Sequence, residues 1–97
     1  MRVVAKKILR EFWEKYNDSE QQLKTWYKET SKADWKNPTE IKAEYSKASI
    51  LKSGRVVFNI CRNKYRLVVE INYLRRWVFV RFIGTHAEYD KIDANNI

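Results

Sequence analysis

The sequence predicts an α+β domain in which helices pack on one face of an antiparallel sheet. Amphipathic helical stretches fill the first half of the chain, and three stretches rich in β-branched and aromatic residues follow Gly54. The three strand-like stretches are close enough in sequence to pair as a meander of hairpins. With 44% hydrophobic and 14% aromatic residues, the 97-residue chain has core material for a single domain spanning residues 1–97.

The first predicted elements are a short strand and two helices. Arg2 to Val4 can form the strand. A first helix is expected next, ended by Asn17-Asp18, because apolar residues recur at the i, i+4 spacing of one helical face. That face consists of Ile8, Leu9, Phe12, Trp13 and Tyr16. Ser19 and Gln22 form a capping-box pattern, so a second helix is predicted from there to about Ala33.

A third, shorter helix is predicted before the strands. Asn37 is its expected cap, Pro38 takes the first helical position, Glu40 follows three residues after the cap, and the helix should end near Tyr45. Residues 46–54 are expected to be a polar connection. The three predicted strands are Arg55 to Cys61, Lys64 to Tyr73 and Arg76 to Ile83.

Alternation along the strands separates a core face from a half-polar face, which we call the mixed face and expect to be the working surface. The core face is predicted to hold Phe58, Ile60, Tyr65, Leu67, Val69, Ile71, Val78, Val80 and Phe82. The mixed face is predicted to hold Val57, Asn59, Arg66, Val68, Glu70, Asn72, Trp77, Phe79, Arg81 and Ile83. With two-residue turns, Asn59 lies opposite Arg66 and Val68 lies opposite Arg81, so the two arginines should meet on neighbouring strands.

Charge and composition restrict the partner and the compartment. Twenty Lys and Arg against twelve Asp and Glu give a net charge of +8. That charge favours a polyanionic partner such as nucleic acid, although a merely solvated surface explains it equally well. The single cysteine, Cys61, cannot form an internal disulfide, and no apolar run reaches the roughly 20 residues that span a bilayer. No signal peptide is recognisable, so we expect a cytoplasmic protein with no membrane partner.

Metal and cofactor sites are not expected. One histidine and one cysteine cannot supply the usual ligands of a zinc site, and two glycines leave no glycine-rich phosphate loop.

His86, the only histidine, lies where the last strand gives way to a short helical segment. Histidine transfers protons near neutral pH because its unperturbed pKa lies there. RNA cleavage without a metal needs a base for the 2′-hydroxyl, an acid for the leaving 5′-oxygen and fixed positive charge. In this hypothesis His86 is the acid, and Tyr89 stacks on or hydrogen-bonds the substrate. Arg66 and Arg81 stabilise the developing charge.

The same residues have structural interpretations. Thr85 can cap a final helix with Glu88 at its third position, and His86 is then a structural residue of that helix. Glu70, the candidate base on the mixed face, can equally form an ion pair with Arg66 or Arg81. A non-catalytic basic module that binds nucleic acid therefore stays an alternative to an enzyme.

Several segments resemble the HigB branch of the RelE-type bacterial toxins. They are Val57-Phe58-Asn59-Ile60, Asn63-Lys64-Tyr65-Arg66-Leu67-Val68, Val80-Arg81, Ile83-Gly84-Thr85-His86 and Glu88-Tyr89-Asp90. The similarity spans the chain, and Thr-His-x-Glu-Tyr-Asp at its C-terminal end is the most specific part. The predicted order of elements also fits a RelE-like fold. Family members often carry glycines in the turn where this chain has Cys61-Arg62.

The resemblance implies a ribosome-dependent mRNA endonuclease without metal or cofactor, neutralised by a helix-turn-helix antitoxin, HigA, encoded beside it. Its partners would be mRNA, the ribosomal RNA and that antitoxin. On this basis the residues expected to contact RNA are Asn59, Arg62, Asn63, Lys64 and Asp90. The His86 and Tyr89 motif disfavours a further alternative, a ParE-like toxin, which shares the fold but inhibits DNA gyrase.

Overall fold

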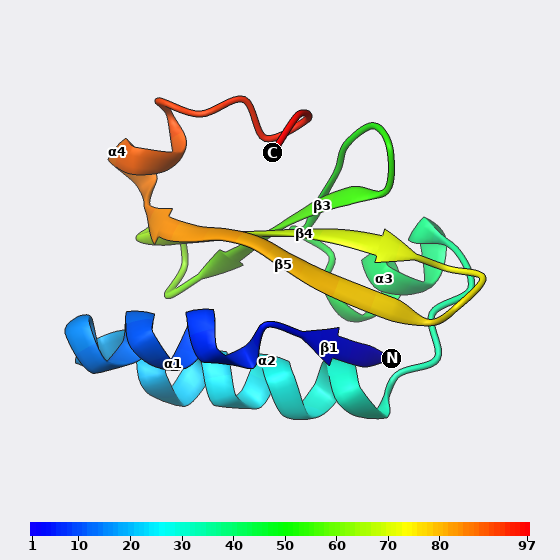
Figure 1. Cartoon of the computed structure of the whole chain (residues 1–97), viewed down its shortest axis with the longest axis horizontal. Helices are drawn as coiled ribbons and strands as arrows, with labels where there is room; N and C mark the ends of the chain where they lie inside the picture. The colour runs from blue at the N-terminus through cyan, green and yellow to red at the C-terminus, as the bar shows by residue number, and fades with distance from the viewer.

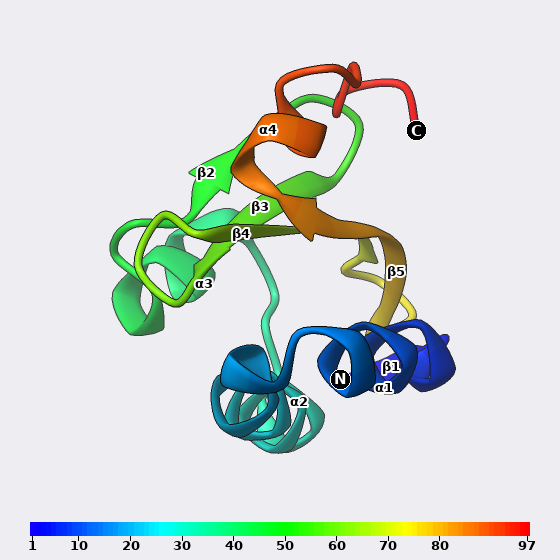
Figure 2. The same ribbon diagram turned by 90° about the vertical axis from the view of Figure 1, so that its left-hand side faces the viewer.

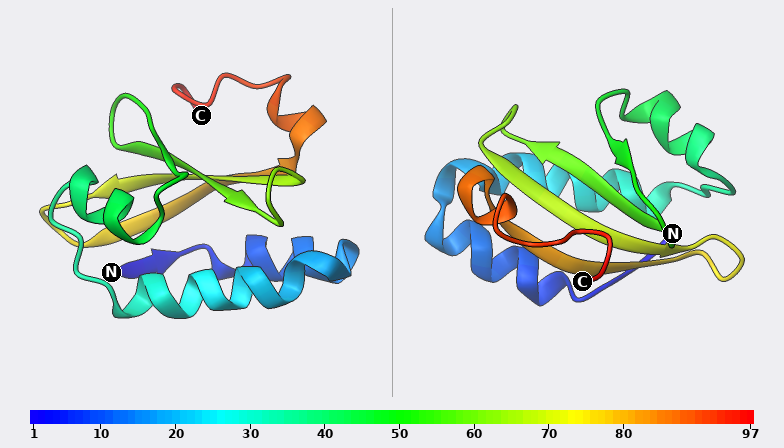
Figure 3. Two further views of the ribbon diagram at one scale, coloured as in Figure 1. Left: turned by 180° about the vertical axis from the view of Figure 1, so that it is seen from behind. Right: turned by 90° about the horizontal axis from the view of Figure 1, so that it is seen from above.

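The computed structural model describes residues 1–97 and confirms the α+β class. Its elements are β1 (Arg2–Val4), α1 (Lys6–Lys15), α2 (Glu20–Lys32), α3 (Pro38–Glu44), β2 (Ser49–Ile50), β3 (Arg55–Ile60), β4 (Tyr65–Asn72), β5 (Trp77–Thr85) and α4 (His86–Tyr89). Helices α1 and α2 lie along one face of the sheet, whereas α4 and the chain that follows it lie on the other (Figures 1 and 2). Helix α3 lies beside the edge formed by β2 (Figure 3).

The sheet has the strand order β1-β5-β4-β3-β2. Strands β3, β4 and β5 form the predicted antiparallel meander, and β1 pairs with β5 in parallel. Strand β2 was not predicted: within the expected polar connection, Ser49 and Ile50 pair with Val57 and Val56 of β3. Two residues are too few to show the alternation of polar and apolar residues that is typical of a strand. Strand β2 exists only because it pairs with the edge of β3.

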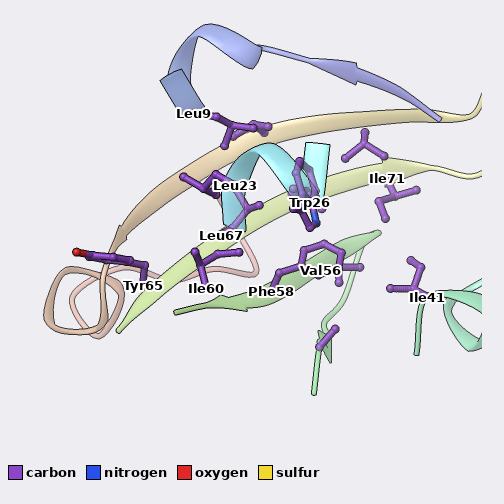
Figure 4. Packing of buried hydrophobic residues seen from close by; sticks show 14 of the residues in the cluster. Leu9, Leu23, Trp26, Ile41, Val56, Phe58, Ile60, Tyr65, Leu67 and Ile71 are labelled. Atoms are coloured by element: carbon purple, nitrogen blue, oxygen red, sulfur yellow. The ribbon is translucent and has the colours of Figure 1, made fainter. Parts of the chain in front are cut away.

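The core lies between the sheet and the two long helices (Figure 4). Leu9 of α1 and Leu23 of α2 are completely buried there, as is Leu67 of β4. Trp26 packs edge-on against Phe58, with ring centroids 5.4 Å apart. The core face predicted from alternation is confirmed except at its last member, Phe82.

A β-bulge accounts for that exception. Val69 pairs with Val80, but the register then shifts and Val68 pairs with Phe82. Arg81 is therefore an extra residue, and the predicted pairing of Val68 with Arg81 is wrong. Beyond the bulge every side chain changes face, as expected when one residue is inserted into a strand.

Residues after the bulge therefore lie on the opposite face of the sheet from the one predicted. Ile83 packs against the helix-covered core, whereas Phe82 packs with Val57 and Val68 on the mixed face. The expectation from alternation reversed these two positions. Both residues are apolar, so the sequence does not show which of them faces the core, and the bulge could not be predicted from them.

The C-terminal residues 91–97 fold back across the mixed face (Figure 3). Ala94 is buried against Val57 and Val68. The Arg55 side chain donates to the Ile97 carbonyl from Nε at 3.1 Å and from Nη2 at 2.6 Å. The middle of the mixed face is thus covered, and the expectation that the whole face is a working surface is wrong.

The start of α2 differs from the expected capping box. Ser19 lies in a 3-10 turn, Asn17–Ser19, and its hydroxyl donates to the Tyr16 carbonyl at 2.7 Å instead of capping the helix. Gln22 accepts the backbone N–H of Cys61 at 2.6 Å. Ser19 is the residue before α2, as predicted, but the expected capping hydrogen bonds are absent because Ser19 itself has helical dihedral angles instead of the extended ones of a capping residue.

The caps of α3 and α4 are as predicted. Asn37 Oδ1 accepts the Glu40 N–H at 3.1 Å. Thr85 Oγ1 accepts the Glu88 N–H at 3.2 Å, and the Glu88 carboxylate accepts the Thr85 N–H at 2.8 Å. This backbone hydrogen bond from Thr85 holds the pKa of Glu88 below its ordinary value. The complete box fixes where β5 ends and α4 begins.

None of the helices has the length and apolar character needed to cross a bilayer.

Asp18 ties the β3–β4 hairpin to the junction of α1 and α2. Lys64 donates to its carboxylate, and the Tyr65 hydroxyl donates to Oδ1 at 2.7 Å. These hydrogen bonds, from Lys64 first, hold the pKa of Asp18 below its ordinary value of 3.8. The stability gained from a lowered carboxyl pKa is present above the unfolded pKa and is lost as the pH falls through the folded pKa.

Asp18→Asn is therefore expected to lower the urea midpoint at about pH 7 and to have a smaller effect in acid, at about pH 2, because the stability gained from the lowered pKa is lost as the pH falls. The loss should be modest because the carboxylate is exposed. Urea unfolding of both proteins at both pH values measures it. Equal shifts at the two pH values would show that the hydrogen bonds to ionised Asp18 do not stabilise the fold.

Candidate functional site

The candidate site lies at the end of the sheet where the β3–β4 hairpin meets α4. Antiparallel pairing sets Arg66 of β4 opposite Gly84 of β5. The backbone N–H of His86 donates to the Lys64 carbonyl at 3.0 Å. The first residue of α4 is therefore fixed to the hairpin through its main chain.

Five of the residues predicted from the sequence gather here, and we call them the His86 cluster: Asn63, Arg66, His86, Tyr89 and Asp90. The Arg66 guanidinium donates to Asn63 Oδ1 at 3.2 Å, and its Cζ lies 5.8 Å from the centre of the Tyr89 ring. His86 Nε2 is 3.5 Å from Asp90 Oδ1, one helical turn later. Half of the His86 side chain is exposed, so a substrate can reach it.

The register of the β3–β4 hairpin confirms the predicted pairing of Asn59 with Arg66. The turn that sets this register holds Cys61 and Arg62 at φ values of 52° and 63°, the left-handed region that glycine favours. The backbone N–H of Lys64 nevertheless closes the turn by donating to the Cys61 carbonyl at 3.1 Å. The absence of family-typical glycines has therefore not changed the register.

Lys64 and Arg62, which were expected to contact RNA, are placed differently from the His86 cluster. The Lys64 ammonium forms an ion pair with Asp18, and this hydrogen bond raises the pKa of Lys64. Lys64 contributes its carbonyl, not its charge, to the placement of His86. Arg62 is exposed at the tip of the hairpin and forms no ion pair.

Arg81 and Glu70 lie elsewhere on the mixed face. Arg81 donates to Glu70 Oε1 from Nε at 3.0 Å and from Nη2 at 2.7 Å, and Arg55 donates to the other carboxylate oxygen at 3.2 Å. Glu70 is four residues from Arg66 along β4, about 13 Å. The expectation that Arg66 and Arg81 meet is therefore wrong, and Glu70 is an ion-pair partner of Arg81 and Arg55 instead of a base beside His86.

No group of three or more His, Cys, Asp and Glu side chains is arranged to hold a metal ion.

Gly84 is a site residue that the sequence analysis did not single out. A Cβ atom there would lie 2.5 Å from the Phe82 ring and 3.0 Å from Glu88 Oε1, the carboxylate of the capping box. A glycine inside a strand often marks such a close approach, and this was the available signal. Gly84 therefore lets α4 fold tightly against the end of β5.

Gly84→Ala is expected to displace the Glu88 carboxylate and with it α4. Overpacking of this kind costs roughly 1–3 kcal/mol, measurable by urea unfolding. The activity of the folded protein should fall as well, because α4 carries His86 and Tyr89.

Gly54→Ala is the matched control for this prediction. Gly54 has a φ of 76°, and an added Cβ would lie 2.7 Å from the Ile71 carbonyl oxygen. This variant should be destabilised but should retain its activity per folded molecule. If Gly84→Ala behaves in the same way, the close approach at Gly84 does not position the site.

The part of the chain that forms this site is similar to a known protein family. Residues 19–92 match the HigB toxin family, described as the RelE-like toxic component of a toxin-antitoxin system. The chain belongs to the HigB toxin family. The match includes the β3–β4 hairpin, β5 and α4, and hence all five members of the His86 cluster.

Individual HigB proteins are similar over nearly the whole chain. The mRNA interferase HigB of Escherichia coli O6:H1 is 27% identical over 94 residues, which cover 95% of this chain and 91% of that protein. The mRNA interferase toxin HigB of E. coli K12 is 27% identical over 96 residues, which cover 97% and 92%. The mRNA interferase HigB of Shigella flexneri gives the same values. The resemblance seen in the sequence motifs is thus confirmed for the family, and these matches do not favour the ParE-like alternative.

Proposed function

We propose that this HigB family member is the toxin of a type II toxin-antitoxin pair and cleaves mRNA that is being translated. The observation that carries the proposal is the His86 cluster, in which the Arg66 guanidinium lies over the ring of Tyr89 and Tyr89 shares the short helix α4 with the half-exposed His86. The net charge of +8 suits a polyanionic substrate. Relatives named mRNA interferases support the choice of RNA.

The proposed reaction is a metal-independent phosphodiester transfer. A base removes the 2′-hydroxyl proton, the 2′-oxygen attacks the adjacent phosphorus, and the bond to the 5′-oxygen breaks. His86, as imidazolium, donates its proton to that leaving oxygen, and Asp90 stabilises the charged ring from 3.5 Å. The products are a 2′,3′-cyclic phosphate and a 5′-hydroxyl.

Arg66 supplies the fixed positive charge in this mechanism. Guanidinium groups grip phosphate oxygens with paired donors and stay charged at any working pH. Tyr89 supports the guanidinium through its ring face and offers a hydroxyl to the substrate. Asn59, opposite Arg66, and Asn63, bonded to it, add neutral donors for the RNA backbone.

The ribosome and an antitoxin complete the proposal. Glu70 is engaged by two arginines, so the base comes from the RNA or from the ribosome. A base supplied by the ribosome would make cleavage depend on translation. The reaction then takes place in the cytoplasm. A HigA-like helix-turn-helix protein encoded beside this gene is proposed to neutralise the toxin, and its co-expression should restore growth.

The test is to add the purified chain to a translation extract and to map the RNA ends. We expect cuts within translated messages, with 5′-hydroxyl and 2′,3′-cyclic phosphate ends. The same message without ribosomes is the control and should stay intact. Intact translated RNA would refute the nuclease, 5′-phosphate ends would refute the mechanism, and equal cutting of free RNA would refute ribosome dependence. DNA breaks without RNA cleavage would favour gyrase inhibition.

A further inference from the structure

A second polar surface lies at the other end of the mixed face, away from the His86 cluster. We call it the Trp77 platform and define it as Arg75, Trp77, Phe79 and Arg81. The Trp77 and Phe79 rings meet edge to face, with centroids 5.7 Å apart. The Arg75 Cζ lies 5.7 Å from the centre of the Trp77 ring, and the Arg81 Cζ lies 5.2 Å from that of Phe79. Aromatic rings and guanidinium groups thus alternate across one surface.

Trp77 differs from the other tryptophans in its exposure. Trp13, Trp26 and Trp35 are only 7%, 2% and 2% exposed and belong to the core. Trp77 and Phe79 are partly exposed, and neither belongs to the two clusters of buried residues or to the apolar residues packed against them. Packing in the core therefore does not explain aromatic residues at these two positions.

The surroundings of the platform are positively charged. Arg2 of β1 lies opposite Trp77 in the parallel pair, and Arg75 is exposed in the hairpin. Two acidic side chains lie nearby: Glu70 is shared between Arg55 and Arg81, and Asp34 pairs with Arg76, so arginines outnumber them. The ligand that suits this surface is an anion with flat apolar parts.

We propose that the Trp77 platform binds single-stranded RNA adjacent to the segment at the His86 cluster. Bases stack on Trp77 and Phe79, and Arg75 and Arg81 hold the phosphates. Proteins that bind single strands combine stacking rings with a cationic surface in this way. The inference rests on the proposed function, because it extends the path of the same RNA substrate.

The two surfaces are connected by β5. Trp77 begins this strand, and Gly84, opposite Arg66, lies close to its other end. Gly84 is five positions after Phe79, which corresponds to about 16 Å along an extended strand. An extended RNA of a few nucleotides is long enough to span this distance, and it would cross over residues 91–97, which cover the face between the two surfaces. Arg81, expected from sequence to act in catalysis, belongs to substrate binding in this arrangement.

Intrinsic fluorescence tests the proposal, because Trp77 is the only tryptophan that is not buried. The probe is a 2′-O-methyl RNA of about 12 nucleotides, which cannot be cleaved and is within the usual site size. We expect it to quench the fluorescence of the wild-type chain. Trp77→Ala and Phe79→Ala should each weaken binding of a labelled probe by roughly 5- to 150-fold, the loss expected for one stacked base.

Matched variants separate stacking from folding. Trp77→Phe keeps an aromatic ring and should bind the labelled probe nearly as well as wild type. Arg10→Ala removes one charge from an exposed side chain of α1 and should have little effect. Thermal unfolding of Trp77→Ala checks that the chain still folds. In the ribosomal cleavage assay, Trp77→Ala should raise KM and leave kcat unchanged.

Several results would overturn the inference. One is a wild-type chain that does not bind the probe, and another is Trp77→Ala binding it as tightly as wild type. A change in Trp77 fluorescence with the antitoxin but not with RNA would assign the platform to a protein partner. Binding through Trp77 without any cleavage of translated mRNA would refute the proposed function and keep this inference, whereas cleavage with an unchanged KM in Trp77→Ala would do the reverse.

Discussion

His86→Ala should slow the cleavage of translated mRNA by about 10²–10⁴-fold, the contribution of a positioned general acid. Histidine is the residue type best suited to donate a proton in a reaction near neutral pH, and half of the His86 side chain is exposed to a substrate. The side chain is half exposed, and the hydrogen bond by which His86 holds α4 to the hairpin comes from its backbone N–H. The free energy of unfolding should therefore change by no more than about 0.5 kcal/mol. Rates of RNA cleavage on programmed ribosomes and urea midpoints measure the two effects.

The role of His86 as proton donor can be separated from a role in holding RNA. An RNA with sulfur in place of the leaving 5′-oxygen does not need protonation, because a thiolate leaves readily. Wild type and His86→Ala should cleave this RNA at similar rates. An equal defect on both substrates would mean that His86 positions the RNA, and no defect on either would favour the non-catalytic binding module.

Local patterns predicted most of this fold because they are set by short-range physics. The i, i+4 apolar spacing predicted α1, and the Asn37 and Thr85 patterns predicted the starts of α3 and α4. Strand alternation gave the core face and the pairing of Asn59 with Arg66. In each case the residues that determine the structure are close in sequence or directly paired.

The errors arise where tertiary contacts decide. Nothing in Arg81-Phe82-Ile83 distinguishes a regular strand from a bulged one, so the shift near Val68 reversed two positions. Ser19 carries a strong capping pattern, but the turn leading into α2 uses its hydroxyl otherwise. The coverage of the mixed face by residues 91–97 depends on Ala94 reaching Val57, far apart in the chain.

The same distinction applies to the candidate site. The motif from Thr85 to Asp90 and the β3–β4 hairpin each act locally, and the cluster they form was predicted. The ion-pair partners were not, because each charged residue had several candidates. Lys64 pairs with Asp18, 46 positions away, and Arg81 pairs with Glu70 instead of lying near Arg66.

Arg66→Ala is the second substitution with a large expected effect, a loss of about 10²–10³-fold in kcat. Arg66 is the only arginine of the His86 cluster, so no neighbouring guanidinium within it can replace its charge at the phosphate. Arg66→Lys should restore only part of the activity, because an ammonium lacks the planar fork and the stack on Tyr89. Single-turnover cleavage on ribosomes measures kcat independently of product release.

Two controls separate the catalytic charge from net charge and from the ring that supports it. Arg10→Ala lowers the net charge equally but removes an exposed residue that pairs with Glu14 on α1, and it should cleave at the wild-type rate. Tyr89→Phe keeps the ring under Arg66 and should lose less activity than Tyr89→Ala. If Arg10→Ala is as defective as Arg66→Ala, overall attraction to RNA explains the loss. Charge stabilisation at the reacting phosphate then has to come from the ribosome, and the role assigned to Arg66 is wrong.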